Sequence, residues 1–155
     1  MNPSETEPTT QNVMSSSEPE TFPLTKDQLL FAESIYACLP MSIEIYDTNG
    51  ILRSINEHAL QMYGVTDKTT VVNIVNLFNS PYMDETLKNR IHRGEDIVLE
   101  FEYDFDRIKD NAYFSTQNKN TIIYEAKVVP LRSKEGEIIG HILPVSYTHL
   151  RAHET

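Results

Sequence analysis

The densest set of side chains that could do chemistry is a run of four carboxylates spaced two residues apart: Glu100, Glu102, Asp104 and Asp106. Paired carboxylates can bind a divalent cation or share the acid and base roles of glycoside hydrolysis. Both chemistries need groups that converge on one point or face each other across a cleft. Alternate residues of a strand stand in a row instead. We therefore interpret the run as a solvated strand face and predict neither a metal site nor a catalytic pair there.

Histidine is the other residue type that could act as a base or a ligand. His58, His92 and His141 fall in separate parts of the sequence, which has no glycine-rich phosphate loop and no CxxC, HExxH or GxSxG motif. A lone histidine is usually a surface residue or a satisfied core residue. We predict no catalytic residue, and the alternative is a small enzyme that uses His58 or His92 as a base.

The carboxylate row belongs to the clearest strand of the sequence, residues 97–106. A helix would scatter the apolar residues between the carboxylates around its circumference, whereas a strand places them on one face. Burying one large apolar side chain contributes about 1.5–3 kcal/mol, so this row should stabilise the fold. Its members are Ile97, Leu99, Phe101, Tyr103 and Phe105.

The segment Met41–Gly64 predicts a strand, a tight turn, a second strand and a short helix. Ile43 and Ile45 alternate with Glu44, which is typical of a strand with one buried face. Asn49-Gly50 favours the positive φ of a hairpin turn. Asn56 can cap the helix, and Gly64 can end it in the left-handed conformation.

The remaining elements complete an α+β order. Thr25 and Gln28 predict a capping box at the start of a helix that Pro40 stops. Two strands, then helices, then three strands is an α+β pattern. The other segments are a weakly helical stretch at 67–76, a helix at 83–93, a polar loop at 107–119, a strand at 120–131, and a last strand at 137–144.

Several short motifs, taken in order, resemble the PAS domains of bacterial sensor histidine kinases. They lie on both sides of the segment at 41–64, and the resemblance covers roughly residues 24–144. The resemblance implies a five-stranded antiparallel sheet with helices over one face, and a sensory module without chemistry of its own. The motifs are Leu39-Pro40, Gly64-Val65, the segment from Asn76 to Pro81, the segment from Tyr103 to Asp106, and the stretch from Val128 to Gly140.

The resemblance also implies a ligand pocket between the helices and the sheet. Plain core packing is the alternative for every residue that could line it. The pocket candidates are Leu77, Phe78, Ile91, Leu99, Phe101, Tyr124 and Ala126.

The resemblance raises the question of a cofactor, which the sequence leaves unknown. Some PAS domains bind haem through a histidine near the position of His92, but the helix around His92 is mostly polar. Light-sensing PAS domains carry an Asn-Cys-Arg-Phe-Leu motif that this chain lacks, and Cys38 lies far upstream of that place. We therefore expect neither haem nor a photochemical flavin.

The two ends of the chain differ from the middle. Residues 1–23 are rich in Ser, Thr, Glu and Pro and predict a disordered polar tail. Residues 24–144 form the predicted PAS-like sensory domain. Residues 145–155 resemble the translation of a transposase-type sequencing adapter, so we interpret them as an artefactual tail. On this interpretation the natural protein continued, and its catalytic domains are missing here.

Charge and composition limit the partners. The chain has 13 Lys and Arg against 23 Asp and Glu, a formal net charge of −10, which argues against nucleic acid. No apolar run is long enough to span a membrane and no signal peptide is recognisable, so the expected location is the cytoplasm. The resemblance implies a homodimer, with a kinase domain and a response regulator as partners of the intact protein. A PAS module that only dimerises, in a transcriptional regulator or another signalling protein, is the alternative.

Overall fold

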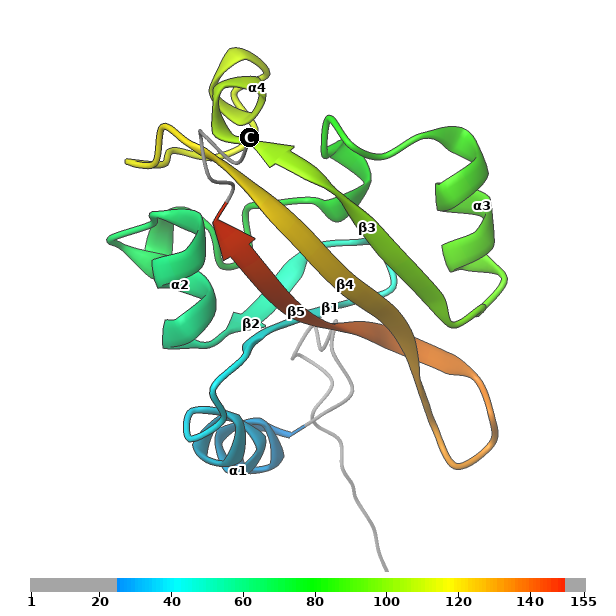
Figure 1. The fold of residues 1–155 in the computed structure, drawn as a ribbon. Coiled ribbons are helices and arrows are strands. Elements are labelled where there is room, and N and C mark those ends of the chain that lie inside the picture. Colours follow the sequence, from blue (N-terminus) through cyan, green and yellow to red (C-terminus); the bar gives the residue numbers. More distant parts are fainter. Residues whose placement is uncertain (1–24, 150–155) are drawn as a thin grey trace, which may run out of the picture.

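The computed structural model describes residues 25–149, and these form one antiparallel sheet with helices around it (Figure 1). The strand order is β2-β1-β5-β4-β3, and every neighbouring pair is antiparallel. The predicted α+β class and five-stranded sheet are therefore confirmed. The strands are β1 (Ser42–Tyr46), β2 (Leu52–Ile55), β3 (Ile97–Asp104), β4 (Thr121–Arg132) and β5 (Ile138–His149).

Most helices cover one face of this sheet, and the main core lies between them and the strands. A smaller cluster of Tyr36, Ile43 and Ile45 lies on the opposite face, where α1 packs. None of the helices described is long and apolar enough to cross a membrane. The helices are α1 (Lys26–Tyr36), α2 (Glu57–Tyr63), α3 (Glu85–His92) and α4 (Phe105–Asp110), with short 3-10 helices η2 (Lys68–Thr70) and η3 (Leu77–Asn79).

Helix α1 begins as predicted and ends early. The capping box is present, because the Gln28 amide donates to Thr25 Oγ1 and the Thr25 amide donates to Gln28 Oε1, both at 3.0 Å. The helix ends at Tyr36, and the amides of Cys38 and Leu39 donate to the Ile35 and Tyr36 carbonyl oxygens in a turn before Pro40. The Tyr36 hydroxyl shares a hydrogen bond with Ser54 of β2, so α1 is attached to the sheet.

The turn between β1 and β2 requires a glycine. Gly50 has a φ of +85°, whereas Asn49 stays outside the positive region. A Cβ atom on Gly50 would lie 2.6 Å from Cδ2 of Phe78, so any side chain would clash there. Asp47 Oδ1 accepts the amides of Asn49 and Ile51 at 2.9 and 3.0 Å, which fixes the turn.

The prediction that β1 has one exposed face is wrong. All five of its residues are buried, and Glu44 is only 2% exposed. The reason is the position of β1, which lies between β2 and β5 with α1 on one face and the main core on the other. Ile43 and Ile45 face α1, and alternation therefore turns Glu44 toward the main core.

Strand β3 confirms the aromatic row but ends two residues early. Tyr103 is 4% exposed, while Val98 on the other face is 73% exposed.

Helix α4 replaces the last two strand residues and the start of the predicted polar loop. Asp104 caps it by accepting the Asp106 amide at 2.9 Å, and Phe105 and Ile108 are fully buried at helical spacing. The prediction missed this three-residue period.

The predicted weak helix at 67–76 is also wrong. The stretch holds only η2, a turn with Asn73 at φ +67°, and a bridge between Ile51 and Asn76. β-Branched valines in this stretch are stiff at χ1 and disfavour a regular helix. The next helix, α3, forms as predicted, with Asp84 Oδ1 accepting the Leu87 amide at 2.7 Å.

The sequence predicted that the last strand stops at Pro144, but β5 continues to His149. Residues 145–149 pair with β4, and Val145 is 1% exposed. Apolar Val145 and Tyr147 alternate with polar Ser146 and Thr148, which is the period that a half-buried strand needs. The artefactual origin of 145–155 stays a prediction, and the polar tail at 1–23 lies outside the described residues.

Candidate functional site: an aromatic cavity around a buried carboxyl

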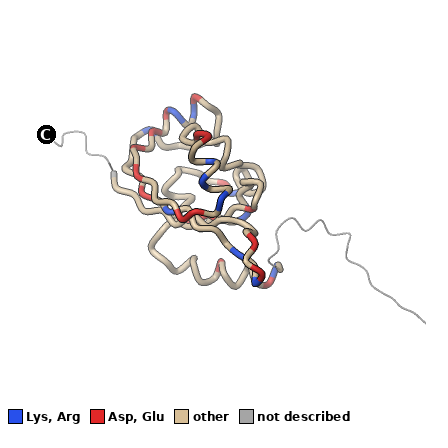
Figure 2. The backbone as a smooth tube through the Cα atoms, turned by 90° about the vertical axis from the view of Figure 1, so that its right-hand side faces the viewer, with Lys and Arg blue, Asp and Glu red and all other residues tan. Residues whose placement is uncertain are grey.

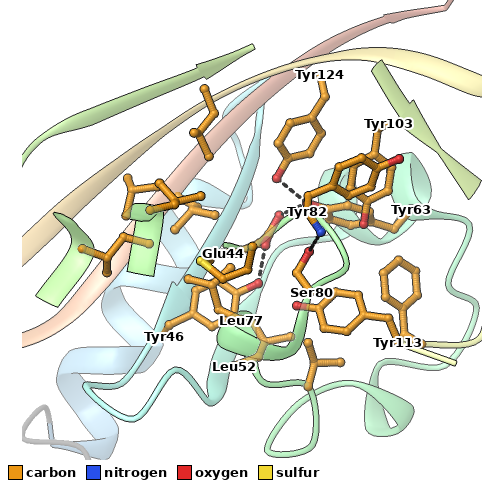
Figure 3. A pocket seen from close by; sticks show the side chains of 18 of the residues that line it. Glu44, Tyr46, Leu52, Tyr63, Leu77, Ser80, Tyr82, Tyr103, Tyr113 and Tyr124 are labelled. Carbon is orange, nitrogen blue, oxygen red and sulfur yellow. Dashed lines mark hydrogen bonds between the residues drawn. The ribbon is translucent and has the colours of Figure 1, made fainter. Parts of the chain in front are cut away.

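A cavity of about 440 Å³ lies between the sheet and the helices that cover it (Figure 3). The volume falls within the range of about 300–1,000 Å³ typical of small-molecule sites. All five strands contribute to its wall, together with α2, α3 and the segments around η3 and after α4. Six of the eight tyrosines of the chain line it: Tyr46, Tyr63, Tyr82, Tyr103, Tyr113 and Tyr124.

Glu44 forms the polar end of this cavity. The Tyr46 hydroxyl donates to Glu44 Oε1 at 2.6 Å, and the Tyr63 hydroxyl donates to Oε2 (Figure 3). The hydroxyls of Tyr63 and Tyr124 are 3.0 Å apart. Because the Tyr63 proton is directed to Glu44, Tyr124 donates to Tyr63. The result is a chain of hydrogen bonds from β4, through α2, to β1.

Burial is the largest cause of the pKa shifts in this cluster. Loss of solvation raises the pKa of Glu44 from 4.5 to about 7, against the opposing effect of the hydrogen bonds from Tyr46 and Tyr63. Burial and the nearby Glu44 also raise the pKa of Tyr63 and Tyr124 well above 10. The tyrosines therefore remain donors at neutral pH, while the carboxyl titrates near it.

No described basic side chain pairs with Glu44. The lining includes one described cation, Arg90, whose Nε donates to Glu95 Oε1 at 2.8 Å near the surface. Asp84, which also lines the cavity, is committed to the cap of α3. Within the described residues the cavity thus presents an acidic group without a counter-ion.

Stacked rings form the wall beside this carboxyl. The ring of Tyr103 lies 4.9 Å from that of Tyr124 and 5.1 Å from that of Tyr82, nearly parallel to both. Phe101 lies 4.9 Å from Tyr124. The Tyr82 hydroxyl accepts the Asp104 amide at 2.8 Å, which connects the segment before α3 to the end of β3. The wall is therefore held in place by both packing and hydrogen bonds.

Five of the seven predicted pocket residues lie in the cavity lining: Leu77, Ile91, Leu99, Phe101 and Tyr124. Ala126 is buried in the core outside it. Phe78 packs against Gly50 and lies beside His92, with 4.8 Å between ring centroids and an angle of 35° between the rings. A ligand-binding role for any of the seven stays a prediction.

Sequence reasoning missed the polar half of the site. Glu44 was assigned to solvent, and Tyr46, Tyr63 and Tyr113 were not considered as lining residues. One available signal was that Glu44 and Tyr46 are two residues apart and so share a strand face. The burial of that face depends on β1 being an interior strand, which only the topology reveals.

His58, His92 and His141, the histidines whose side chains the structure describes, and Cys38 lie outside the cavity. His92 is exposed at the end of α3, His58 Nδ1 is 3.1 Å from Ser42 Oγ, and His141 Nε2 is 3.3 Å from the Ile91 carbonyl oxygen. Cys38 is exposed after α1. In residues 25–149 no three His, Cys, Asp or Glu side chains gather as a metal site would need.

Comparison of the sequence with known families identifies the class of protein. The pattern of the PAS domain family matches residues 40–145, which is more than half of the chain. The chain therefore belongs to the PAS domain family. Among curated proteins, no sequence matches the chain.

Solved structures share this fold at low sequence identity. A PAS domain from a two-component sensor histidine kinase matches with a TM-score of 0.56 at 12% identity, covering 81% of this chain and 100% of that one. The PAS domain of Bordetella pertussis BvgS gives 0.51 at 19%, covering 81% and 90%. The light-state dimer of the fungal photoreceptor Vivid gives 0.54 at 13%, covering 70% and 78%.

Proposed function

We propose that this PAS domain is a sensory module that binds a small molecule in the cavity and passes the bound state to the kinase domain of a sensor histidine kinase. The observation that carries the proposal is the cavity itself, which places a buried carboxyl and three hydroxyls beside an apolar wall. Ligand sites combine mostly apolar walls with a few placed polar groups in this way. The kinase assignment, with a response regulator downstream and the cytoplasm as location, rests on the sequence resemblance.

Strands β1 and β5 provide a physical route for the signal. Leu143 of β5 lines the cavity, whereas the adjacent Ile142 packs on the other face against the cluster of Tyr36, Ile43 and Ile45. A ligand that shifts either strand therefore changes the packing beneath α1. The coupling free energy between two such sites, here the cavity and the packing beneath α1, is typically about 1–3 kcal/mol.

A substitution that narrows the cavity tests the binding half of the proposal. Leu99→Trp replaces a leucine of the lining with a bulkier indole side chain that fills part of the cavity. We therefore expect it to weaken binding of a co-purifying or added small molecule at least about tenfold. Native mass spectrometry of the purified chain would identify the bound molecule and calorimetry its affinity. Val98→Trp is the matched control, because Val98 is exposed on the other face of β3. Equal binding by the two variants would contradict the proposal.

A module that only dimerises is the second candidate. It is favoured by the apolar surface of α1, where Leu30, Phe31 and Ile35 are 51%, 69% and 53% exposed. PAS domains commonly dimerise, and a homodimer is compatible with either candidate. An empty cavity in a stable dimer would favour this second function.

A further inference from the structure

The carboxyl of Glu44 retains unused capacity for hydrogen bonds. It is 2% exposed and accepts two bonds, from Tyr46 and Tyr63. An ionised carboxylate offers about four acceptor positions, so about two remain. A buried charge without a counter-ion is costly, and none of the described Lys, Arg or His side chains supplies one. The group is therefore suited to a partner that brings positive charge.

The rings around Glu44 favour the same charge. The ring of Tyr63, whose hydroxyl donates to Glu44, lies 5.8 Å from that of Tyr103 and 6.5 Å from that of Tyr124, so three aromatic side chains line the cavity together with the carboxyl. The negative face of an aromatic ring attracts a cation, and the attraction is stronger in a desolvated site. The Tyr103 hydroxyl, on a side chain 4% exposed, makes no hydrogen bond within the described residues and can bind a polar ligand atom.

We propose that the cavity binds a small organic amine in its protonated form, with Glu44 as the counter-ion and the tyrosine rings around the ammonium group. This inference rests on the proposed function, because it names the chemistry of the molecule that the sensory cavity takes. The aromatic and aliphatic remainder of the wall receives the apolar body of the amine, next to Phe101, Leu99 and Ile91.

A negatively charged ligand fits this cavity poorly. An anion would meet Glu44 at the closed end and Asp84 near α3, where like charges repel. Arg90 is the described cation in the lining, and its guanidinium is already paired with Glu95. A neutral molecule is the competing occupant, and it would bind without regard to the charge of Glu44.

Binding of an ammonium group should release a proton. Below about pH 7 the empty site holds Glu44 mostly protonated, and a bound cation favours the carboxylate, so the carboxyl proton passes to solvent. The affinity of an amine that stays protonated should therefore rise with pH up to about 7. The titratable or charged groups that face Glu44 or line the cavity with it are Tyr46 on β1, Tyr63 on α2, Tyr82 and Asp84 before α3, Arg90 on α3, Tyr103 on β3, Tyr113 after α4, Tyr124 on β4 and, beside Tyr46, His141 on β5.

Three probes of one shape and different charge test the proposal on the full chain: 2-phenylethylamine, 2-phenylethanol and 3-phenylpropionate. Calorimetry at about pH 6 and about pH 8 should give the amine at least about tenfold tighter binding than the alcohol, and no binding of the carboxylate. At the lower pH, buffers with different ionisation heats should report release of up to about one proton per amine bound. The proton measurement uses the unaltered protein, so it does not depend on a variant that folds.

Two carboxyl-to-amide variants provide the matched pair. Glu44→Gln should weaken the amine at least about tenfold and leave the alcohol unchanged. Glu100→Gln, on the exposed face of β3, should change neither. Alcohol binding as tight as amine binding, with no effect of Glu44→Gln, would overturn the amine inference and leave the sensory cavity standing.

If none of the three probes binds, native mass spectrometry of the purified chain shows whether the cavity already holds a co-purifying molecule and which one. A co-purifying neutral or anionic molecule would then overturn the inference alone, and a protonated amine would support it. A chain that is empty and binds none of the probes would overturn both the inference and the proposed function.

Discussion

Glu44 is a single residue that makes the stability of the fold depend on pH. Its folded pKa of about 7 lies above the ordinary value of 4.5, so folding favours the protonated form. The stabilisation is complete below about pH 4.5 and is lost as the pH rises through about 7. The loss corresponds to about 3 kcal/mol in the free energy of unfolding.

Replacing this residue should remove that dependence. We expect Glu44→Gln to gain stability relative to the unaltered chain as the pH rises from about 5 to about 7.5, because the amide never ionises. Urea denaturation of both proteins across this range measures the difference in their free energies of unfolding. Burial lowers the pKa of His141, which has the opposite effect on stability, but His141 is present in both proteins and its effect cancels in the difference. A constant difference between the two proteins would show that Glu44 does not titrate there.

At the scale of elements, α1 joins the sheet by one end and leaves an apolar side uncovered within the described residues. Tyr36 is buried against Ile43 and Ile45, and Ser54 Oγ donates to Glu33 Oε2 at 2.6 Å. Phe31, five residues before Tyr36, is 69% exposed. A helix with this pattern is suited to pairing with a second copy of the chain.

The expected result of Phe31→Lys is a shift from dimer to monomer with little change in fold. The added charge would lie in the middle of the proposed interface, where burial without a partner is costly. Light scattering after size exclusion measures the mass over a range of concentrations. Val98→Lys alters an equally exposed apolar residue on β3 and should leave the mass unchanged. Identical masses for all three proteins would argue against pairing through α1.

At the scale of the whole molecule, β1 and β5 are among the strands that contribute side chains to both hydrophobic clusters, one on each face of the sheet. We expect a bound ligand to slow hydrogen exchange in α1, although α1 does not line the cavity. The reason is that stabilising the cavity face of β5 also stabilises Ile142 on its other face. Exchange monitored by mass spectrometry, with Leu99→Trp as the control that should lose the effect, tests this coupling. Protection confined to the cavity lining would contradict it.

Local patterns were sufficient to predict most of the fold. The capping box of α1, the Asn56 cap of α2, the turn glycine and the alternation of β3 depend on residues a few positions apart, so they are visible in the sequence. Lys and Arg lie interspersed with Asp and Glu over the described chain (Figure 2).

The candidate site was only half predictable, because it depends on which strands become neighbours. The apolar lining follows from burial, and five of the seven residues proposed for a pocket lie in it. Glu44 looked like a surface residue, since a strand at an edge would have exposed it. Helix α4 was missed because Phe105 continued the strand pattern while also starting a helical one.

The concentration of tyrosines around the cavity has an optical consequence. The chain contains no tryptophan, and six of its eight tyrosines line one space. Near-ultraviolet circular dichroism and tyrosine emission of this protein therefore originate mainly from the walls of the cavity. Occupancy can be followed by light without a dye or a label.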